Sequence, residues 1–296
     1  MKETYIDLHT HTLMSDGAYT PEKLCTMARE AGIGILALTD HNYMVDLAPL
    51  QQQFPEIRFI PGVELNCRYY VQGQALDIHV VGLGVDPNHP TLKNTLARNN
   101  LERAPYINAI LDRLRECGID LGTYDTLLEL YPETRQIGRM DIARLMKQRG
   151  HVPSVAEAFH LYIGALGKRL AYVPNPSNYV SLEEGVSAIL AAGGIPVLAH
   201  LFYYGMSQEE NLRLLALFKK LAGDRGAMEV YYSVYNQEER MALKALADIF
   251  GLMYSAASDF HGQKEGETLA HHFRSSDCAA LLEVLGIGIE APATTF

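Results

Sequence analysis

Short apolar runs, rich in β-branched and aromatic residues, alternate with longer helical patterns along most of the chain. The runs predict strands near Tyr5–His9, Ile33–Thr39, Arg58–Leu65, Leu76–Leu83, Ile195–Ala199, Ala227–Tyr231 and Leu252–Ser258. Strands that alternate with helices are typical of a parallel α/β sheet or barrel. The pattern therefore predicts an α/β fold whose seven strands form a barrel-like sheet, one strand short of a complete eight-stranded barrel.

Two helix starts carry strong local signals. Thr20 precedes Pro21, which places a side-chain cap before a proline at the first helical position. Ser181 opens the segment SLEEGVSAILAAGG, which has acidic residues in its first turn and glycines at its end. Both positions are predicted to begin helices.

The alternation of strands and helices stops between Asp86 and about Val180. Consecutive helices are predicted there over Pro90–Cys117, Thr123–Leu130, Met140–Arg149 and Val155–Leu161, with Leu170–Val173 as the one short stretch able to pair as a strand. We therefore divide the chain into a barrel of residues 1–86 and 181–296 and a helical insert of residues 87–180. The insert follows a strand that carries a candidate ligand, which favours a cap that contacts substrate over a peripheral insert that only adds bulk.

The charge balance narrows the range of partners. The chain has 35 acidic and 25 basic residues, giving a formal net charge of −10. A net negative charge of this size repels a nucleic-acid backbone, so we expect no nucleic-acid polymer as a partner. A small phosphorylated substrate stays compatible with this charge, because bound metal ions and a few local cations can outweigh it.

Other features of the composition bear on the compartment. No apolar run approaches the roughly 18–20 residues that a bilayer requires, and the N-terminus lacks the profile of a signal peptide. The four cysteines are scattered and form no CxxC pair, which predicts reduced thiols. We expect a cytoplasmic protein with no membrane partner.

Histidines and acids gather at or near the ends of the predicted strands. These candidate ligands are His9, His11, Asp16, His41, Glu64, His79, His200, Asp259 and His261. Taken singly, an HxH pair such as His9 and His11 is more often a pair of ordinary polar residues at the surface or in the core than a pair of metal ligands. A lone His79 in an apolar strand is more often a buried imidazole whose hydrogen bonds are satisfied. Together they favour a metal centre, because burying so many ionisable groups without a cation is very costly. Asp40, Asp77 and Glu229 are candidates to orient the ligands.

The types of ligand constrain the metal. Six imidazoles with three carboxylates and no thiolate suit Mn, Fe or Zn better than Ca or Mg. Nine ligands exceed the needs of one ion, so we expect two or three divalent ions, with Mn favoured and Glu64 as the bridging carboxylate. Several ions that lie close together lower the pKa of a bridging water and hold an oxyanion substrate from both sides.

The segments DLHTHTLMSDG, ALTDHN, PGVEL, IHVVG, LAH and SDFHG, in this order, resemble the signature blocks of the PHP (polymerase and histidinol phosphatase) superfamily. The resemblance implies a distorted seven-stranded (β/α)7 barrel with a two- or three-metal centre, and all nine residues above match ligand positions. The chain is most similar to stand-alone bacterial PHP phosphoesterases with a helical insert, which act on small phosphate esters. One block departs from the pattern, since Asp141 stands where relatives often have histidine.

The expected activity is metal-dependent hydrolysis of a small phosphorylated substrate, foremost the 3′-phosphate of a nucleoside 3′,5′-bisphosphate, by a metal-bridging hydroxide. The expected catalytic residues are His200, Glu64 and Asp259. The proton for the leaving oxygen comes from His200, from another imidazole near that oxygen or from a metal-bound water. Arg139 and Lys168 are the first candidates to bind the rest of the substrate, with Arg98 and Arg103 behind them.

Other activities stay open at this point. Within the same chemistry, the alternatives are a cyclic phosphodiesterase acting on a ribose or nucleotide cyclic phosphate, and a histidinol-phosphate phosphatase. Amidohydrolase barrels also begin with HxH, but they generally need a lysine or bridging acid on the fourth strand, where this chain has His79. An accessory metal-binding PHP module without activity would be expected to have lost ligands, and none is missing here.

Overall fold

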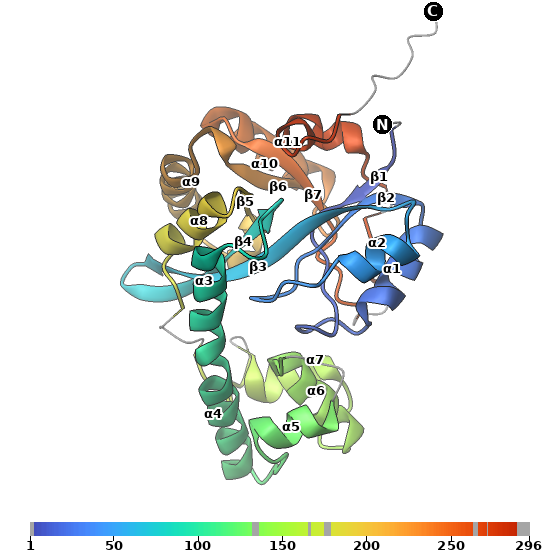
Figure 1. The fold of residues 1–296 in the computed structure, drawn as a ribbon. Helices are drawn as coiled ribbons and strands as arrows, with labels where there is room; N and C mark the ends of the chain where they lie inside the picture. The colour runs from blue at the N-terminus through green and yellow to red at the C-terminus, as the bar shows by residue number, and fades with distance from the viewer. Residues whose placement is uncertain are drawn as a thin grey trace, which may run out of the picture.

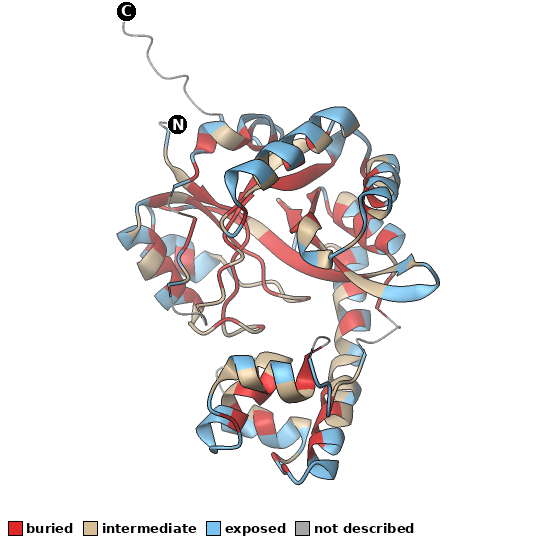
Figure 2. Ribbon diagram, turned by 180° about the vertical axis from the view of Figure 1, so that it is seen from behind, coloured by how far each residue is buried: buried red, intermediate tan, exposed pale blue. Residues whose placement is uncertain are grey.

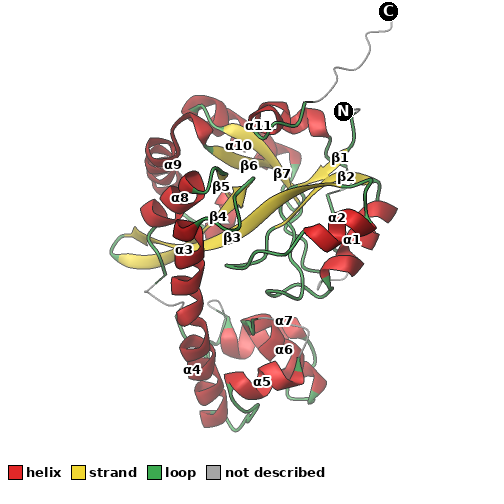
Figure 3. Cartoon of the chain, in the orientation of Figure 1, coloured by secondary structure: helices red, strands yellow, loops and turns green. Residues whose placement is uncertain are grey.

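A computed structural model of the chain describes residues 3–131, 136–164, 167–174, 179–262, 266–270 and 272–288. Its strands form one seven-stranded sheet in the order β1-β2-β3-β4-β5-β6-β7 (Figures 1 and 3). They are β1 (Tyr5–Asp7), β2 (Ile33–Leu38), β3 (Arg58–Val71), β4 (Gln74–Leu83), β5 (Ile195–Leu198), β6 (Ala227–Tyr232) and β7 (Met253–Ala257). The predicted α/β fold with seven strands is confirmed.

Helices connect the strands or cover them. Those around the sheet are α1 (Pro21–Glu30), α2 (Ala48–Gln53), α3 (Pro90–Leu101), α8 (Leu182–Ala191), α9 (Gln208–Ala222), α10 (Gln237–Phe250) and α11 (Ala279–Val284), with short 3-10 helices at Leu201–Tyr204, Gly223–Arg225 and Ser275–Cys278. The predicted caps of α1 and α8 are confirmed, since the side chains of Thr20 and Ser181 accept bonds from the amides of Lys23 and Glu184. No helix among the described residues is long and apolar enough to cross a membrane.

Strand β4 departs from the parallel arrangement that is typical of such a sheet. Strands β1, β2 and β3 are parallel, as are β5, β6 and β7, but β4 is antiparallel to both neighbours. The two-residue turn Gln72–Gly73, with positive φ at both positions, folds β3 and β4 into a hairpin. This hairpin sets His79 directly opposite Asn66, two residues beyond Glu64, so His79 reaches the same face although its strand runs the other way.

The first and last strands also lie side by side. The amide of Leu8 donates to the carbonyl of Ala256 at 2.9 Å, and the amide of Asp259 donates to the carbonyl of His9 at 2.9 Å. One apolar cluster takes a buried residue from every strand, namely Ile6, Ile35, Ile60, Val81, Val197, Ala227 and Ala256, with α11 packed against it. The sheet therefore curves around a common apolar interior and brings the end of β1 beside the end of β7.

The remaining helices form a cap with a core of its own. They are α4 (Arg103–Glu116), α5 (Tyr124–Leu130), α6 (Arg139–Gln148), α7 (Val155–Ala158) and a π-helical turn at Phe159–Ile163. Buried residues of these elements, such as Ile110, Leu127 and Met146, form one cluster (Figure 2). Leu170–Val173 is not a strand.

The predicted helix Pro90–Cys117 is divided at Glu102 into α3 and α4. Helix α3 packs on α8 of the barrel, and its buried Leu92 belongs to a barrel cluster, so the separate core begins only at α4. The C-terminal end of the expected barrel segment, residues 289–296, lies outside the described residues.

Candidate metal centre

Two buried aspartates organise the loops that carry the first and last ligands. Asp40 accepts bonds from the amide of Thr12 at 2.8 Å, its hydroxyl at 2.8 Å and the hydroxyl of Ser15 at 2.6 Å. Asp7 accepts from the amide and hydroxyl of Ser258, at 3.0 and 2.6 Å. Asp40 therefore shapes the loop after β1, whereas we had expected it to orient a histidine directly.

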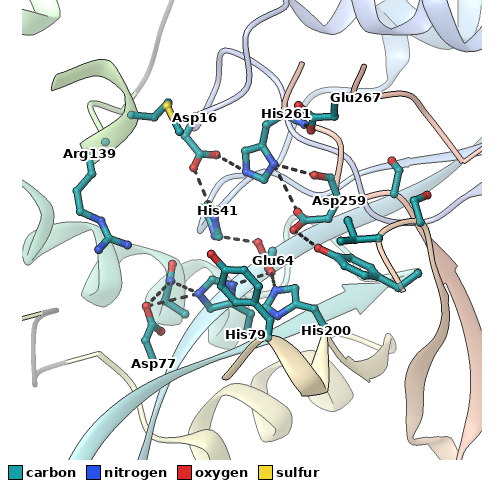
Figure 4. A pocket seen from close by; sticks show the side chains of 18 of the residues that line it. Asp16, His41, Glu64, Asp77, His79, Arg139, His200, Asp259, His261 and Glu267 are labelled. Carbon is teal, nitrogen blue, oxygen red and sulfur yellow. Dashed lines mark hydrogen bonds and ion pairs between the residues drawn. The ribbon is translucent and has the colours of Figure 1, made fainter. Parts of the chain in front are cut away.

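Glu64 lies at the centre of the cluster. Its carboxylate oxygens lie 2.9 Å from His41 Nδ1, 2.9 Å from His79 Nδ1 and 3.3 Å from His200 Nε2 (Figure 4). They also lie 3.2 Å from His11 Nε2 and 3.3 Å from His9 Nε2. The side chain is only 1% exposed. A carboxylate that contacts five imidazoles from four segments of the chain has a placement that fits a bridging ligand.

The other two carboxylates complete the cluster on the side of β7. Asp259 Oδ1 lies 3.1 Å from His11 Nε2 and 3.4 Å from His9 Nε2. Asp16 lies 3.3 Å from His261 Nε2 and 3.8 Å from His41 Nε2. The fold thus brings all nine expected ligands into one continuous group.

The geometry of the donor atoms fits divalent ions. Within the part of the chain that the structure describes, three sets have ligand atoms within 4.8 Å of one another: His11, Asp16, His41 and His261; His9, His11 and Glu64; and His41, Glu64 and His79. His9 Nε2 and His11 Nε2 face each other at 3.0 Å, beside two carboxylates. His41 Nδ1 and Glu64 Oε2 are buried and lie 2.9 Å from each other. Donor atoms that converge in this way are suited to two or three ions.

Burial and neighbouring charges shift the pKa values of these groups in opposite directions. Burial alone would raise the pKa of Glu64, but the surrounding imidazoles, led by that of His41, hold this pKa well below its usual range. Burial would lower the pKa of His11, but hydrogen bonds to Asp259 and Glu64 raise it to about 10. In the absence of ions, protonated imidazoles therefore balance the carboxylates, and bound cations would take over that balance.

Glu229 holds two of the ligands in place. Its Oε1 lies 2.6 Å from His9 Nδ1, and its Oε2 accepts from the amide of His200 at 2.7 Å. A carboxylate behind a ligating imidazole fixes which ring nitrogen carries the proton and leaves the other free for the ion. Glu229 orients two ligands, as the sequence had suggested, without entering any of the three ligand sets.

We expect Glu229→Gln to weaken Mn²⁺ binding by about 10- to 100-fold. Glutamine can accept from only one of the two donors, and its NH₂ group then faces the other. Titration calorimetry of the metal-free protein measures the affinity, with Glu238→Gln, an exposed change in α10, as the control. Equal affinities for the two variants would contradict this role of Glu229.

Some contributors to the centre were not predicted. The hydroxyl of Tyr232 donates to Asp259 Oδ2 at 2.8 Å, and Asn66 Nδ2 lies 3.1 Å from His79 Nε2. Asn66 lies two residues beyond Glu64 on the same strand, and a period of two places both side chains on one face. That spacing was the available signal. Tyr232 had none beyond its place at the end of a strand.

A cavity of about 650 Å³ lies between the cluster and the cap, and Arg139 points into it from the cap (Figure 4). Its lining includes Glu64 from the barrel and Arg103, Tyr106, Arg139 and Tyr179 from the insert. The insert therefore covers the centre and supplies cations to it.

The expected substrate contacts divide into two groups. Arg139 and Arg103 line the cavity, whereas Lys168 is exposed and does not. Arg98 pairs with Glu184 at 2.8 Å on the surface. Asp141 accepts from the amide of Gly138 at 2.8 Å, which stabilises the start of α6, and it does not line the cavity.

Six imidazoles and three carboxylates thus cluster beside a seven-stranded α/β sheet. Such a cluster is typical of a metal-dependent hydrolase. The family model for the PHP domain matches residues 7–169. The chain belongs to the PHP domain family and is a metal-dependent phosphoesterase.

Curated relatives carry related names. The 5′-3′ exoribonuclease Rnm of Escherichia coli is 35% identical over 259 residues, 86% of this chain and 84% of that protein. The 3′,5′-nucleoside bisphosphate phosphatase of Chromobacterium violaceum is 34% identical over 266 residues, 88% of each chain. The phosphoribosyl 1,2-cyclic phosphate 1,2-diphosphodiesterase of Eggerthella lenta is 26% identical, over 87% of this chain and 94% of that protein.

Two solved structures have the same fold. One, described as an amidohydrolase from Chromobacterium violaceum with bound sulfate, has a TM-score of 0.77 at 30% identity and covers 90% of each chain. The other, a candidate metal-dependent phosphoesterase from Bifidobacterium adolescentis, has a TM-score of 0.77 at 25% identity and covers 96% of each chain.

Proposed function

We propose that the enzyme hydrolyses the 3′-phosphate of a nucleoside 3′,5′-bisphosphate. The observation that carries this proposal is a cavity lined both by residues of the metal-ligand cluster and by Arg139 and Arg103 of the cap. Figure 4 shows the guanidinium of Arg139 entering this cavity apart from the imidazoles. A substrate with two phosphates matches a site that has two separate places for anions. The name of the phosphatase relative supports the same substrate class.

The residues of the chain divide the work of this reaction. When bound, the divalent ions supply the charge that activates water and neutralises phosphate oxygens. Glu64, Asp259 and the imidazoles hold the ions, and Tyr232 holds Asp259 through its 2.8 Å hydrogen bond. Arg139 and Arg103 bind the 5′-phosphate, which fixes the distance from that group to the phosphorus that reacts.

His200 lines the cavity beside Glu64 and remains with Glu64 and Asp259 in the proposed catalytic set. It lies outside the three ligand sets, so its Nε2 is placed to give a proton to the leaving 3′-oxygen. A His200→Ala variant that keeps its full metal content, loses kcat on the nucleotide substrate and retains it on p-nitrophenyl phosphate, whose leaving group needs no proton, would assign that proton transfer. Loss of metal instead would make His200 a ligand only.

A second candidate is removal of nucleotides from the 5′ end of RNA, which the names of the exoribonuclease relatives favour. In RNA the 3′-phosphate of the first nucleotide carries the rest of the polymer. Cleavage of the bond to the 3′-oxygen therefore releases the same product, a nucleoside 5′-phosphate, from both substrates. Tyr203 and Val234 line the cavity and are 77% and 73% exposed, so the site is open to solvent there. The expected exclusion of nucleic-acid polymers stays a prediction.

We expect Arg139→Ala to raise KM for a nucleoside 3′,5′-bisphosphate by about 10- to 100-fold, because a charge-assisted hydrogen bond contributes about 1.5–3 kcal/mol. The increase should disappear for a nucleoside 3′-monophosphate, which lacks the group that Arg139 binds. Lys168→Ala is the matched control, since it removes one cation from the cap outside the cavity. Steady-state kinetics with both substrates measures the difference. An equal increase for the two substrates would remove Arg139 from the 5′-phosphate site.

A further inference from the structure

Three buried asparagines lie together where the cap joins the barrel. Asn42 directly follows His41 in the loop after β2, Asn66 lies in β3, and Asn99 lies in the last turn of α3. They are 1%, 6% and 1% exposed, respectively. Buried amides carry a high desolvation cost unless they are hydrogen-bonded, so their partners must be identified.

The asparagines form one continuous series of hydrogen bonds. Asn99 Nδ2 donates to Asn42 Oδ1 at 2.8 Å, Asn42 Nδ2 donates to Asn66 Oδ1 at 2.6 Å, and Asn66 Nδ2 donates to Asp77 Oδ2 at 3.0 Å. At the other end, Asn99 Oδ1 accepts from the amide of Val180 at 2.9 Å. A backbone N–H can only donate and a carboxylate accepts, so the two ends fix the orientation of every amide between them.

At the Asn99 end, the series holds both segments that connect the cap to the barrel. Asn99 lies just before α4 begins, and Asn100 Nδ2 adds a bond to the carbonyl of Asn42 at 3.0 Å. Val180, which is fully buried, lies where the chain returns to the barrel and enters α8. The outgoing and returning segments are therefore tied to each other and to the loop that carries His41.

The second end reaches a metal ligand. Asp77 Oδ2 lies 3.5 Å from His79 Nε2, while His79 Nδ1 faces Glu64 at 2.9 Å. The side-chain NH₂ group of Asn66, 3.1 Å from Nε2, and the carboxylate of Asp77 together hold this edge of the ring, so that Nδ1 faces Glu64. Asn42 adds a further constraint on Glu64, because its backbone N–H donates to the backbone carbonyl of Glu64 at 2.8 Å. The backbone of Asn42 has a φ of 50°.

We infer that the series Asn99–Asn42–Asn66–Asp77 couples the docking of the cap to the metal centre, by setting the ring orientation of His79 from the junction of α3 and α4. The asparagines are positioning residues, because the series acts on the metal centre through Asp77 and His79. The coupling acts in both directions, so a change at Asn99 weakens metal binding and metal binding steadies the cap junction. This inference rests on the metal centre and is independent of which phosphate ester is the substrate.

Asn99→Asp tests the inference, because it replaces the donating NH₂ with an oxygen that faces Asn42 Oδ1 and the carbonyl of Asn66. Thr95→Val is the matched control, since Thr95 is 5% exposed, lies one turn earlier in α3 and bonds only to Thr91 among the described residues. We expect Asn99→Asp to weaken Mn²⁺ binding to the metal-free protein by about 2- to 30-fold relative to Thr95→Val, measured by calorimetry. Affinities within twofold of each other would overturn the coupling, even if both variants had lower melting temperatures.

A second measurement needs no substitution. In the wild-type protein, Mn²⁺ should slow hydrogen exchange of the Val180 amide at least about fivefold, because coupling free energies between sites are typically 1–3 kcal/mol. The amide of Leu127, which bonds to Thr123 within the cap core, is the internal reference and should be much less affected. If Asn99→Asp fails to fold, this measurement decides alone. Unchanged exchange at Val180 on adding Mn²⁺ would overturn the inference.

Discussion

Glu64→Gln should abolish phosphate-ester hydrolysis and reduce metal binding more than any other single substitution at the centre. Both oxygens of Glu64 contact imidazoles from separate segments, and glutamine replaces one oxygen with an NH₂ group that cannot hold a cation. We expect a loss beyond the about 10- to 100-fold typical of residues that only orient a ligand. Metal content by elemental analysis and kcat/KM measure the two effects.

Glu229→Gln is the matched comparison for this prediction. Both glutamates are 1% exposed, both contact His9, and the substitution is chemically the same. The difference between the variants therefore reports the position of the carboxylate and not the loss of a buried charge. If the two variants kept equal activity and metal content, Glu64 would not bridge the ions.

Removing the metal should stop hydrolysis and lower the melting temperature by about 5–10 °C, without unfolding the protein at room temperature. An ion present at 100 times its Kd stabilises the folded chain by about 2.7 kcal/mol, and each kcal/mol shifts Tm by about 2–4 °C in chains of this size. The metal-free protein stays folded because protonated imidazoles such as His11 pair with Glu64 and Asp259.

Calorimetric scans with and without a chelator measure this shift. Mn²⁺ added to the chelated protein should restore both Tm and activity, and His11→Ala, which removes a ligand common to two sets, should reduce the difference in Tm. An unchanged Tm together with full activity in the chelator would show that the cluster does not function as a metal site.

The sequence was most informative where chemistry and local pattern coincide. Each ligand lies at or near a strand recognisable from its apolar run, so the sequence alone places the nine residues on one face. Whether β4 is parallel or antiparallel to its neighbours could not be predicted from the same pattern, because an apolar run of this length looks the same for both directions. Only the hairpin turn Gln72–Gly73 distinguishes the two directions, and it lies beyond the strand end that we predicted.

Contacts made by the cap depend on packing between distant helices. Arg139 and Lys168 are both cations in the same helical insert, yet only Arg139 lines the cavity. Arg103, a weaker candidate from the sequence, also lines it and is the first residue of α4, directly after the interruption of the helix at Glu102. Helical periodicity does not reveal that break. The asparagine series was missed for a similar reason, since its members come from three segments with no common motif.

The most direct test of the proposed function is product release from the Mn²⁺-loaded protein with a set of candidate substrates. The set contains a nucleoside 3′,5′-bisphosphate, a ribose cyclic phosphate, histidinol phosphate and a short 5′-phosphorylated RNA, with His11→Ala as the inactive control. We predict inorganic phosphate and nucleoside 5′-phosphate from the bisphosphate, with loss of both in the control. Release only from the cyclic phosphate, or from histidinol phosphate alone, would contradict the assignment of the 3′-phosphate and of the cap arginines.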